Sequence, residues 1–285
     1  GVVSAAGEQL SLIPIELPGP RLPHDMAITE HYSILMDLPV CVDTEALQRG
    51  RWRSVYRPEL GSRFAVIPRH GKAEDVRWFK AEPCYIYHVV NSWEEGDEVI
   101  MVAHKVAKPV ANSDESTASE FERMLQNLQM NAELWEWRFN LQTGETAERC
   151  LDTVNAEFPT TNPRDQGYPT RYGYAVTIGP LPTLRFDGIR KYDFASGEHQ
   201  EVRFGPGIYG SESPFAPSTV ATAEDQGYLL SFVQDELNER SELWIYDARN
   251  LQAGPCTRLA IPQRVPLGFH ACWVEGKDLK AKAPA

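Results

Sequence analysis

Along most of the chain, apolar and polar residues alternate, or apolar residues gather in short runs rich in β-branched and aromatic side chains. Gly, Pro, Asn and Asp separate these runs, which is the pattern of short strands joined by turns. The pattern therefore predicts a mainly β fold. The clearest predicted strands span residues 85–90, 98–102, 171–176 and 227–233.

One segment departs from the strand pattern and predicts a helical insertion in a loop, within residues 107–131. Between residues 116 and 130 the apolar positions recur at i, i+3, i+4 and i+7, which is the period of an amphipathic helix. Those positions are Phe121, Met124, Leu125 and Leu128.

A weak internal repeat is the strongest indication of architecture. Segments 134–140, 189–194 and 243–248 each lead through an Asn or Asp to a glycine turn, and Gly144, Gly197 and Gly254 lie 53 and 57 residues apart (197 − 144 and 254 − 197). One four-stranded propeller blade uses a similar length. A β-sandwich with chance similarity between hairpins remains an alternative. Since a propeller closes to hide its edge strands, and this length suffices for only about five blades, we expect the sequence to be part of a longer protein.

Composition narrows the class of partners. The 285 residues carry 28 basic and 40 acidic side chains, a net charge of −12, which excludes the basic surface of a nucleic-acid-binding protein. No apolar run approaches the roughly 20 residues that cross a bilayer. Five scattered cysteines without a C-x-x-C pair argue against a disulfide framework and favour a cytoplasmic location.

Three of the seven histidines lie among apolar residues: His24, His88 and His270. A buried imidazole needs a hydrogen-bond partner or a metal ion. Separations of 64 and 182 residues (88 − 24 and 270 − 88) exclude a local helical site, so only converging strands, as on a propeller axis, would unite these histidines. Separate core histidines are the alternative. Charged or turn neighbours indicate surface or structural roles for the other four, His31, His70, His104 and His199.

At these histidines the sequence resembles the carotenoid cleavage oxygenase family, including its bacterial lignostilbene-dioxygenase-like members. The similar segments keep the family's order over residues of about 20 to 275. They are residues 24–29 (HDMAIT), 62–69 (SRFAVIPR), 87–91 (YHVVN), 156–159 (AEFP), 171–174 (RYGY), 224–231 (EDQGYLLS), 247–248 (DA) and 266–270 (PLGFH).

The resemblance implies a seven-bladed β-propeller that holds a non-haem Fe(2+) on its axis through four histidines. Three of those positions match, at His24, His88 and His270, and Glu157 and Glu224 match glutamates that accept hydrogen bonds from His88 and His270. The first iron histidine has no counterpart here. We therefore expect one partial propeller domain over residues 1–285, with about the C-terminal four to five blades and impaired activity on its own.

The implied reaction is O2-dependent cleavage of a carbon–carbon double bond in a carotenoid, apocarotenoid or stilbene-type substrate, giving two carbonyl products. A non-catalytic propeller binding module and a retinoid-ester isomerohydrolase remain rivals, whereas the absence of a G-x-S-x-G motif disfavours a serine hydrolase. The substrate-binding residues are unknown. Trp93, Phe121, Met124 and Phe269 would line a tunnel or fill the core, and residues 121–130 would form a loop helix or a peripheral membrane contact. The oligomeric state is not predicted.

Overall fold

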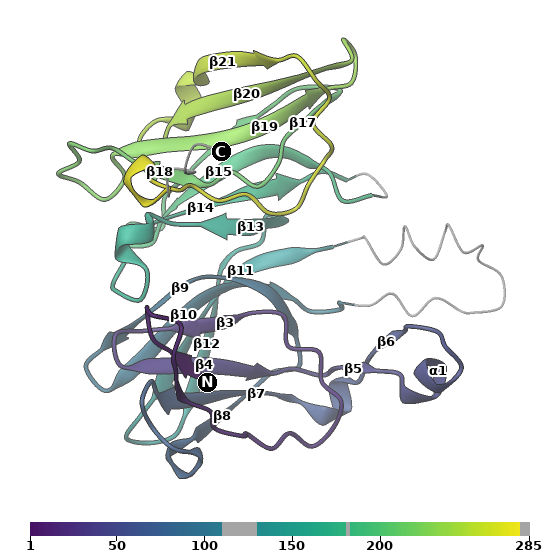
Figure 1. The fold of residues 1–285 in the computed structure, drawn as a ribbon, viewed down its shortest axis with the longest axis vertical. Helices are drawn as coiled ribbons and strands as arrows, with labels where there is room; N and C mark the ends of the chain where they lie inside the picture. Colours follow the sequence, from purple (N-terminus) through teal and green to yellow (C-terminus); the bar gives the residue numbers. More distant parts are fainter. Residues whose placement is uncertain (110–129, 181–182, 280–285) are drawn as a thin grey trace. The chain divides into compact units, whose positions relative to one another are not determined.

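The computed structural model describes residues 1–109, 130–180 and 183–279 (Figure 1). Strands dominate this part of the chain, which confirms the predicted β class. The described residues include one short α-helix, α1 (Thr44–Gln48), capped by the Asp43 carboxylate. None of the described helices is both long and apolar enough to pass through a lipid bilayer. The helical insertion predicted around Phe121 and Met124 lies outside the described residues, except for its ends.

The chain divides into two compact units, each described by itself. The first comprises residues 1–159, 165–170 and 178–184, and the second comprises residues 160–164, 171–177 and 185–285. That both belong to one propeller domain remains a prediction.

The first unit contains two four-stranded sheets whose strands follow one another in chain order. The sheets are β3 (Met26–Ile28), β4 (Tyr32–Asp37), β7 (Ser62–Pro68) and β8 (Arg77–Ala81), then β9 (Tyr85–Glu95), β10 (Glu98–Val106), β11 (Ala132–Asn140) and β12 (Thr146–Asp152). Two small sheets accompany them: β1 (Val2–Val3) with β2 (Gln9–Ser11), and β5 (Val40–Val42) with β6 (Ser54–Tyr56).

The remaining strands form two further sheets with the same kind of order. One contains β13 (Ala156–Thr160), β14 (Tyr172–Ile178), β15 (Phe186–Asp193) and β16 (His199–Arg203), and its first strand runs from the first unit into the second. The other contains β17 (Ile208–Tyr209), β19 (Gly227–Asp235), β20 (Arg240–Asp247) and β21 (Pro255–Ile261), with β18 (Phe215–Pro217) also paired to β19. The four predicted strands correspond to β9, β10, β14 and β19.

The internal repeat corresponds to the last hairpin of three of these sheets: β11–β12, β15–β16 and β20–β21. In each turn a glycine has a positive φ, 78° at Gly144, 75° at Gly197 and 76° at Gly254, a conformation that other residues rarely adopt. The recurring Asn or Asp also has a local role: the Asp193 carboxylate, for example, accepts the backbone N–H of Ala195 at 3.0 Å. The period of the repeat is therefore the number of residues that the chain uses to build one sheet.

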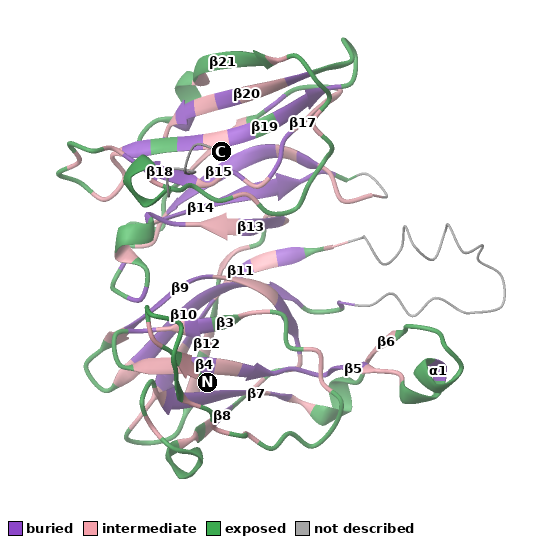
Figure 2. Ribbon diagram, in the orientation of Figure 1, coloured by how far each residue is buried: buried purple, intermediate pink, exposed green. Residues whose placement is uncertain are grey.

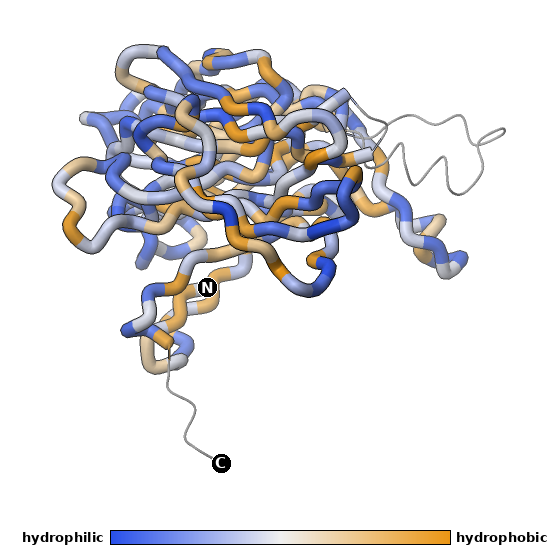
Figure 3. The backbone as a smooth tube through the Cα atoms, turned by 90° about the horizontal axis from the view of Figure 1, so that it is seen from above, coloured by the Kyte–Doolittle hydropathy of each residue, from blue (hydrophilic) through white to orange (hydrophobic). Residues whose placement is uncertain are grey.

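Aromatic side chains between the sheets form a separate core in each unit. In the first, the Phe64 ring lies 5.8 Å from that of Trp137 and 5.1 Å from that of Phe139, and all three side chains are fully buried. In the second, Tyr174 packs against Phe215 at 5.6 Å. Many strand segments are coloured as buried or intermediate in Figure 2, and Figure 3 shows hydrophobic and hydrophilic residues mixed along the whole backbone trace.

Candidate metal centre

His88 lies in an irregular part of β9. Along β10, Val102 pairs with Asn91, Ala103 with Val89, and Lys105 with Ile86, so β9 has one extra residue on each side of Val89. Such β-bulges redirect side chains and are common beside active sites.

The bulges explain an arrangement of rings that a regular strand would not allow. Successive side chains of a regular strand point to opposite faces. Here the consecutive residues Tyr87 and His88 both contact the ring of His24, with centroid distances of 5.1 Å and 5.2 Å. The two imidazoles meet edge to face, at an interplanar angle of 80°. Residues 64 positions apart (88 − 24) are thus neighbours in space.

The predicted contact between Glu157 and His88 is present in the structure. Glu157, on β13, is completely buried, and its Oε2 lies 2.7 Å from Nδ1 of His88. Its Oε1 accepts the backbone N–H of His88 at 3.3 Å. A carboxylate on Nδ1 fixes the tautomer and the ring plane, and it leaves Nε2 as the nitrogen available to a metal ion.

The backbone next to Glu157 adopts an unusual conformation. Phe158 has a φ of 52°, and bulky residues rarely adopt the left-handed region. Its ring packs on His88, with centroids 4.8 Å apart. Such backbone strain costs about 1–3 kcal/mol and persists where surrounding contacts hold it, most often at functional sites.

His24 precedes β3 and is held beside β9 by its neighbours in sequence. The Tyr85 hydroxyl donates a hydrogen bond to the Leu22 carbonyl at 2.6 Å, and Asp25 accepts the Val89 N–H at 2.9 Å. The expectation that all three histidines are buried is wrong: His24 and His270 are exposed, and only His88 is largely covered.

His104, which the sequence assigned to a surface or structural role, is completely buried in β10. Burial lowers its pKa to about 4, although the charge of Glu157 opposes the shift. The ring is therefore neutral at neutral pH. Its burial excludes a surface role. The sequence argument relied on the charge of the adjacent Lys105, but that side chain is itself buried and paired with Glu148 at 3.0 Å.

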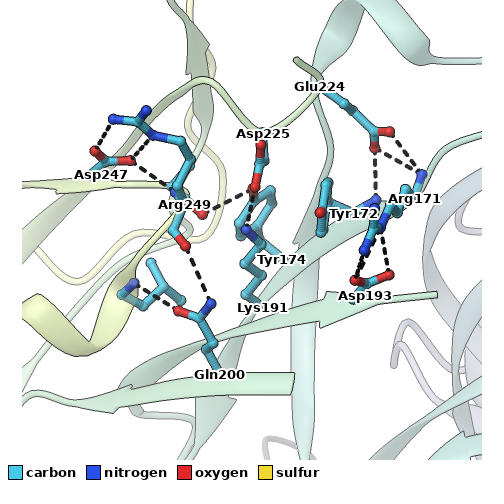
Figure 4. Close-up of polar contacts among 12 residues, drawn as sticks. Arg171, Tyr172, Tyr174, Lys191, Asp193, Gln200, Glu224, Asp225, Asp247 and Arg249 are labelled. Carbon is cyan, nitrogen blue, oxygen red and sulfur yellow. Dashed lines mark hydrogen bonds and ion pairs between the residues drawn. The ribbon is translucent and has the colours of Figure 1, made fainter. Parts of the chain in front are cut away.

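His270 and Glu224, the second predicted histidine–glutamate pair, both lie in the second unit. The structure gives His270 a contact with another carboxylate, and it gives Glu224 contacts with backbone N–H groups. Nδ1 of His270 lies 3.2 Å from Oε2 of Glu212. The Glu224 carboxylate accepts the backbone N–H groups of Arg171 and Tyr172, at 2.9 Å and 2.7 Å (Figure 4). A role for Glu224 at His270, and a place for His270 beside His24 and His88, both remain predictions.

Two side chains of this arrangement have the chemistry of metal ligands. Within residues 1–109, 130–180 and 183–279, no three His, Cys, Asp or Glu side chains form a cluster suited to a metal ion. The His24–His88 pair nevertheless provides two adjacent imidazoles, one already oriented by a buried carboxylate. Neutral imidazoles are good ligands for iron. These two side chains would fill two coordination positions.

The comparison with protein families identifies the chain. The family model described as retinal pigment epithelial membrane protein matches residues 1–275. The chain belongs to this family, the carotenoid cleavage oxygenases. The resemblance inferred from the histidine motifs is thereby confirmed.

Named relatives of this carotenoid oxygenase chain include plant dioxygenases. Carotenoid 9,10(9',10')-cleavage dioxygenase 1 of Phaseolus vulgaris is 33% identical, over 99% of this chain and 54% of the relative. Zeaxanthin 7,8(7',8')-cleavage dioxygenase of Crocus sativus is 30% identical, over 91% and 70%. The chain spans about half the length of the first of these relatives.

Solved structures establish the fold. The lignostilbene dioxygenase of Pseudomonas brassicacearum superposes with a TM-score of 0.84 at 27% identity, covering 96% of this chain and 59% of that one. A cobalt-substituted Synechocystis apocarotenoid oxygenase gives a TM-score of 0.80 at 24% identity, over 91% and 54%, which shows likeness of fold alone. The chain thus has the β-propeller fold of the carotenoid oxygenases, while its number of blades remains a prediction.

Sequence reasoning overlooked two residues of this centre. Asp25 directly follows His24 in the matching segment, so its position was a usable signal. Phe158 carried no signal because the sequence does not reveal a positive φ at an aromatic residue. Of the proposed lining residues, Trp93 is buried and Phe269 is 53% exposed, whereas Phe121 and Met124 are not described.

Proposed function

We propose that the complete protein is a non-haem Fe(II) dioxygenase that cleaves a carbon–carbon double bond to two carbonyl products. The observation that carries the proposal is the His24–His88 pair, with Glu157 on the far nitrogen of His88, in a chain of this family. Bound iron would activate O2 and supply the redox chemistry.

The chain's own residues would hold and orient the ion. His24, His88 and His270 are the proposed ligands, through neutral imidazoles. Glu157 accepts the Nδ1 proton of His88 and keeps Nε2 free of hydrogen, and its negative charge partly balances a cation there. Glu224 is proposed to support His270 in the same way.

The surroundings of the pair favour an apolar, unsaturated substrate. The rings of Tyr87 and Phe158 flank the two imidazoles. Burial, with a further contribution from Glu157, raises the pKa of Tyr87, so the phenol stays uncharged at neutral pH. We propose a carotenoid, apocarotenoid or stilbene-type alkene, in line with the substrates that the names of the relatives print.

The test is made on the full-length protein. Metal content is measured by elemental analysis, and carotenoid, apocarotenoid and stilbene substrates are assayed for aldehyde products under O2. We expect about one iron per chain and O2-dependent products. His88→Ala should lose both iron and activity, whereas His199→Ala, an exposed histidine on β16, should retain both. Full activity in a preparation without transition metal would refute the proposal.

The 285-residue chain by itself contains three of the four histidines that the family resemblance implies. We expect it to bind iron weakly and to turn over little substrate, since incomplete support of a metal centre commonly costs about 10–100-fold in affinity or activity.

A further inference from the structure

A seam of side-chain hydrogen bonds joins β3, in one sheet, to β9, in the next. Asp25 accepts the Val89 N–H at 2.9 Å, Ser92 donates to the Ile28 carbonyl at 2.7 Å, and Thr29 donates to Glu94 at 2.5 Å. The two segments therefore run side by side in the same direction, with a nearly constant register. This seam, defined by these three bonds, fixes β3 against β9 without strand pairing.

The first bond of the seam lies at the candidate metal centre. β9 is the outermost strand of its sheet, so part of its backbone has no neighbouring strand to pair with. Carboxylates take up two consecutive N–H groups at the bulges: Glu157 accepts that of His88, and Asp25 accepts that of Val89.

Asp25 therefore connects the two histidine segments. It directly follows His24, and it binds the amide directly after His88. Its second oxygen accepts the N–H of Met26 at 2.7 Å, which fixes the carboxylate relative to its own backbone. A side chain held at both oxygens loses little freedom when it bridges two segments, and such bridges set distances accurately.

We propose that Asp25 is a positioning residue that sets the spacing of the His24 and His88 rings, and thereby prepares two ligands for iron. The inference deepens the proposed function and rests on it only in the assignment of iron. The structure gives a spacing of 5.2 Å between the two ring centroids.

The experiment compares Asp25→Ala and Asp25→Asn with a matched control in the full-length protein. Asn retains one acceptor oxygen, so it can keep the bond from the Val89 N–H while it loses the bond from the Met26 N–H. The control is Asp43→Ala, because Asp43 also accepts a backbone N–H, that of Ala46 at 3.0 Å, at the start of α1. Three quantities are measured: Val89 amide exchange in the metal-free protein, the ring resonances of 13C-labelled His24, assigned with His24→Asn, and Fe(II) affinity by chelator competition.

For Asp25→Ala we expect Val89 exchange to accelerate about tenfold or more, since its hydrogen bond to a charged group is lost. The His24 resonances should lose the ring-current shifts from Tyr87 and His88, and Fe(II) affinity should fall about tenfold or more. Asp25→Asn should keep slow Val89 exchange, within about threefold of wild type, and its Fe(II) affinity should lie between those of wild type and Asp25→Ala. Asp43→Ala should change stability alone.

Unchanged His24 resonances in Asp25→Ala would overturn the inference. So would an Asp25→Asn protein that keeps slow Val89 exchange but binds Fe(II) as weakly as Asp25→Ala, because the bond to Val89 would then not be what prepares the ligands. If the wild-type protein binds no metal, the proposed function fails, and the exchange and resonance measurements still decide whether Asp25 places the rings. If Asp25→Ala does not fold, Asp25→Asn and the wild type decide: altered His24 resonances in Asp25→Asn, despite slow Val89 exchange, would contradict the proposal.

Discussion

Removal of the Glu157 carboxylate provides the sharpest test of how the candidate centre works. Glu157 is fully buried and accepts two hydrogen bonds from His88, at 2.7 Å from Nδ1 and 3.3 Å from the backbone nitrogen. In Glu157→Ala both donors lose their acceptor, and each buried group without a partner costs about 1–3 kcal/mol. We therefore expect the apo-protein to lose about 3 kcal/mol of unfolding free energy.

The effect on metal binding should exceed what the lost stability explains. Without the carboxylate the His88 ring is free to change tautomer, so Nε2 carries a proton for part of the time. We expect Fe(II) affinity to fall about 10–100-fold in Glu157→Gln, which corresponds to about 1.4–2.7 kcal/mol. The Gln side chain keeps the volume and one acceptor, so the stability loss should be only about 1 kcal/mol.

Chelator competition and chemical denaturation of the apo-protein measure the two quantities separately. The matched control is Glu136→Gln in β11. Glu136 is also a buried glutamate, but its Oε1 contacts arginines, at 3.0 Å from Arg138 Nε and 3.2 Å from Arg149 Nη2. It should lose stability and keep its Fe(II) affinity. If Glu157→Gln and Glu136→Gln bind Fe(II) equally well, the argument that Glu157 orients His88 is refuted.

Three further predictions concern stability. Burial lowers the pKa of His104 from 6.5 to about 4, so the unfolding free energy should fall by about 3 kcal/mol as the pH drops from 6.5 toward 4. The apo His104→Leu protein should lack this part of the pH dependence in urea titrations. Lys191 and Asp225 form a largely buried ion pair at 2.7 Å (Figure 4). Lys191→Met alone should therefore lower the unfolding free energy by about 3 kcal/mol, and the double variant Lys191→Met with Asp225→Leu should lower it clearly less. Equal losses in the two proteins would contradict the pairing. Gly197→Ala should cost about 1 kcal/mol through its φ of 75° alone, whereas Gly188→Ala should cost more because a new Cβ would collide with the Val202 carbonyl and the Thr177 hydroxyl; thermal unfolding distinguishes the two.

Local sequence was sufficient to predict the strands and the hairpins. Alternating and β-branched runs mark β9, β10, β14 and β19, and the Asn or Asp before each turn glycine marks the last hairpin of three sheets. These features are local because strand formation and turn chemistry depend on residues only a few positions apart. For the same reason α1, which is five residues long, left too little periodicity to be recognised.

The choice of His24, His88 and Glu157 also came from the sequence, through the match of several motifs in one order. Their geometry did not. The meeting of His24 with both Tyr87 and His88 depends on two bulges in β9, and the bulges are visible only in the register with β10. Sequence alternation would have placed the two β9 side chains on opposite faces.

What the sequence by itself determined is the β class, the repeated hairpin and the choice of candidate histidines and glutamates for the proposed metal centre. The tertiary structure decided which of them are buried, which carboxylate each contacts, and that Asp25 joins the two histidine segments. The physical reason is range. Turn and strand preferences act over neighbouring residues, whereas burial and hydrogen-bond partners depend on segments that only folding brings together.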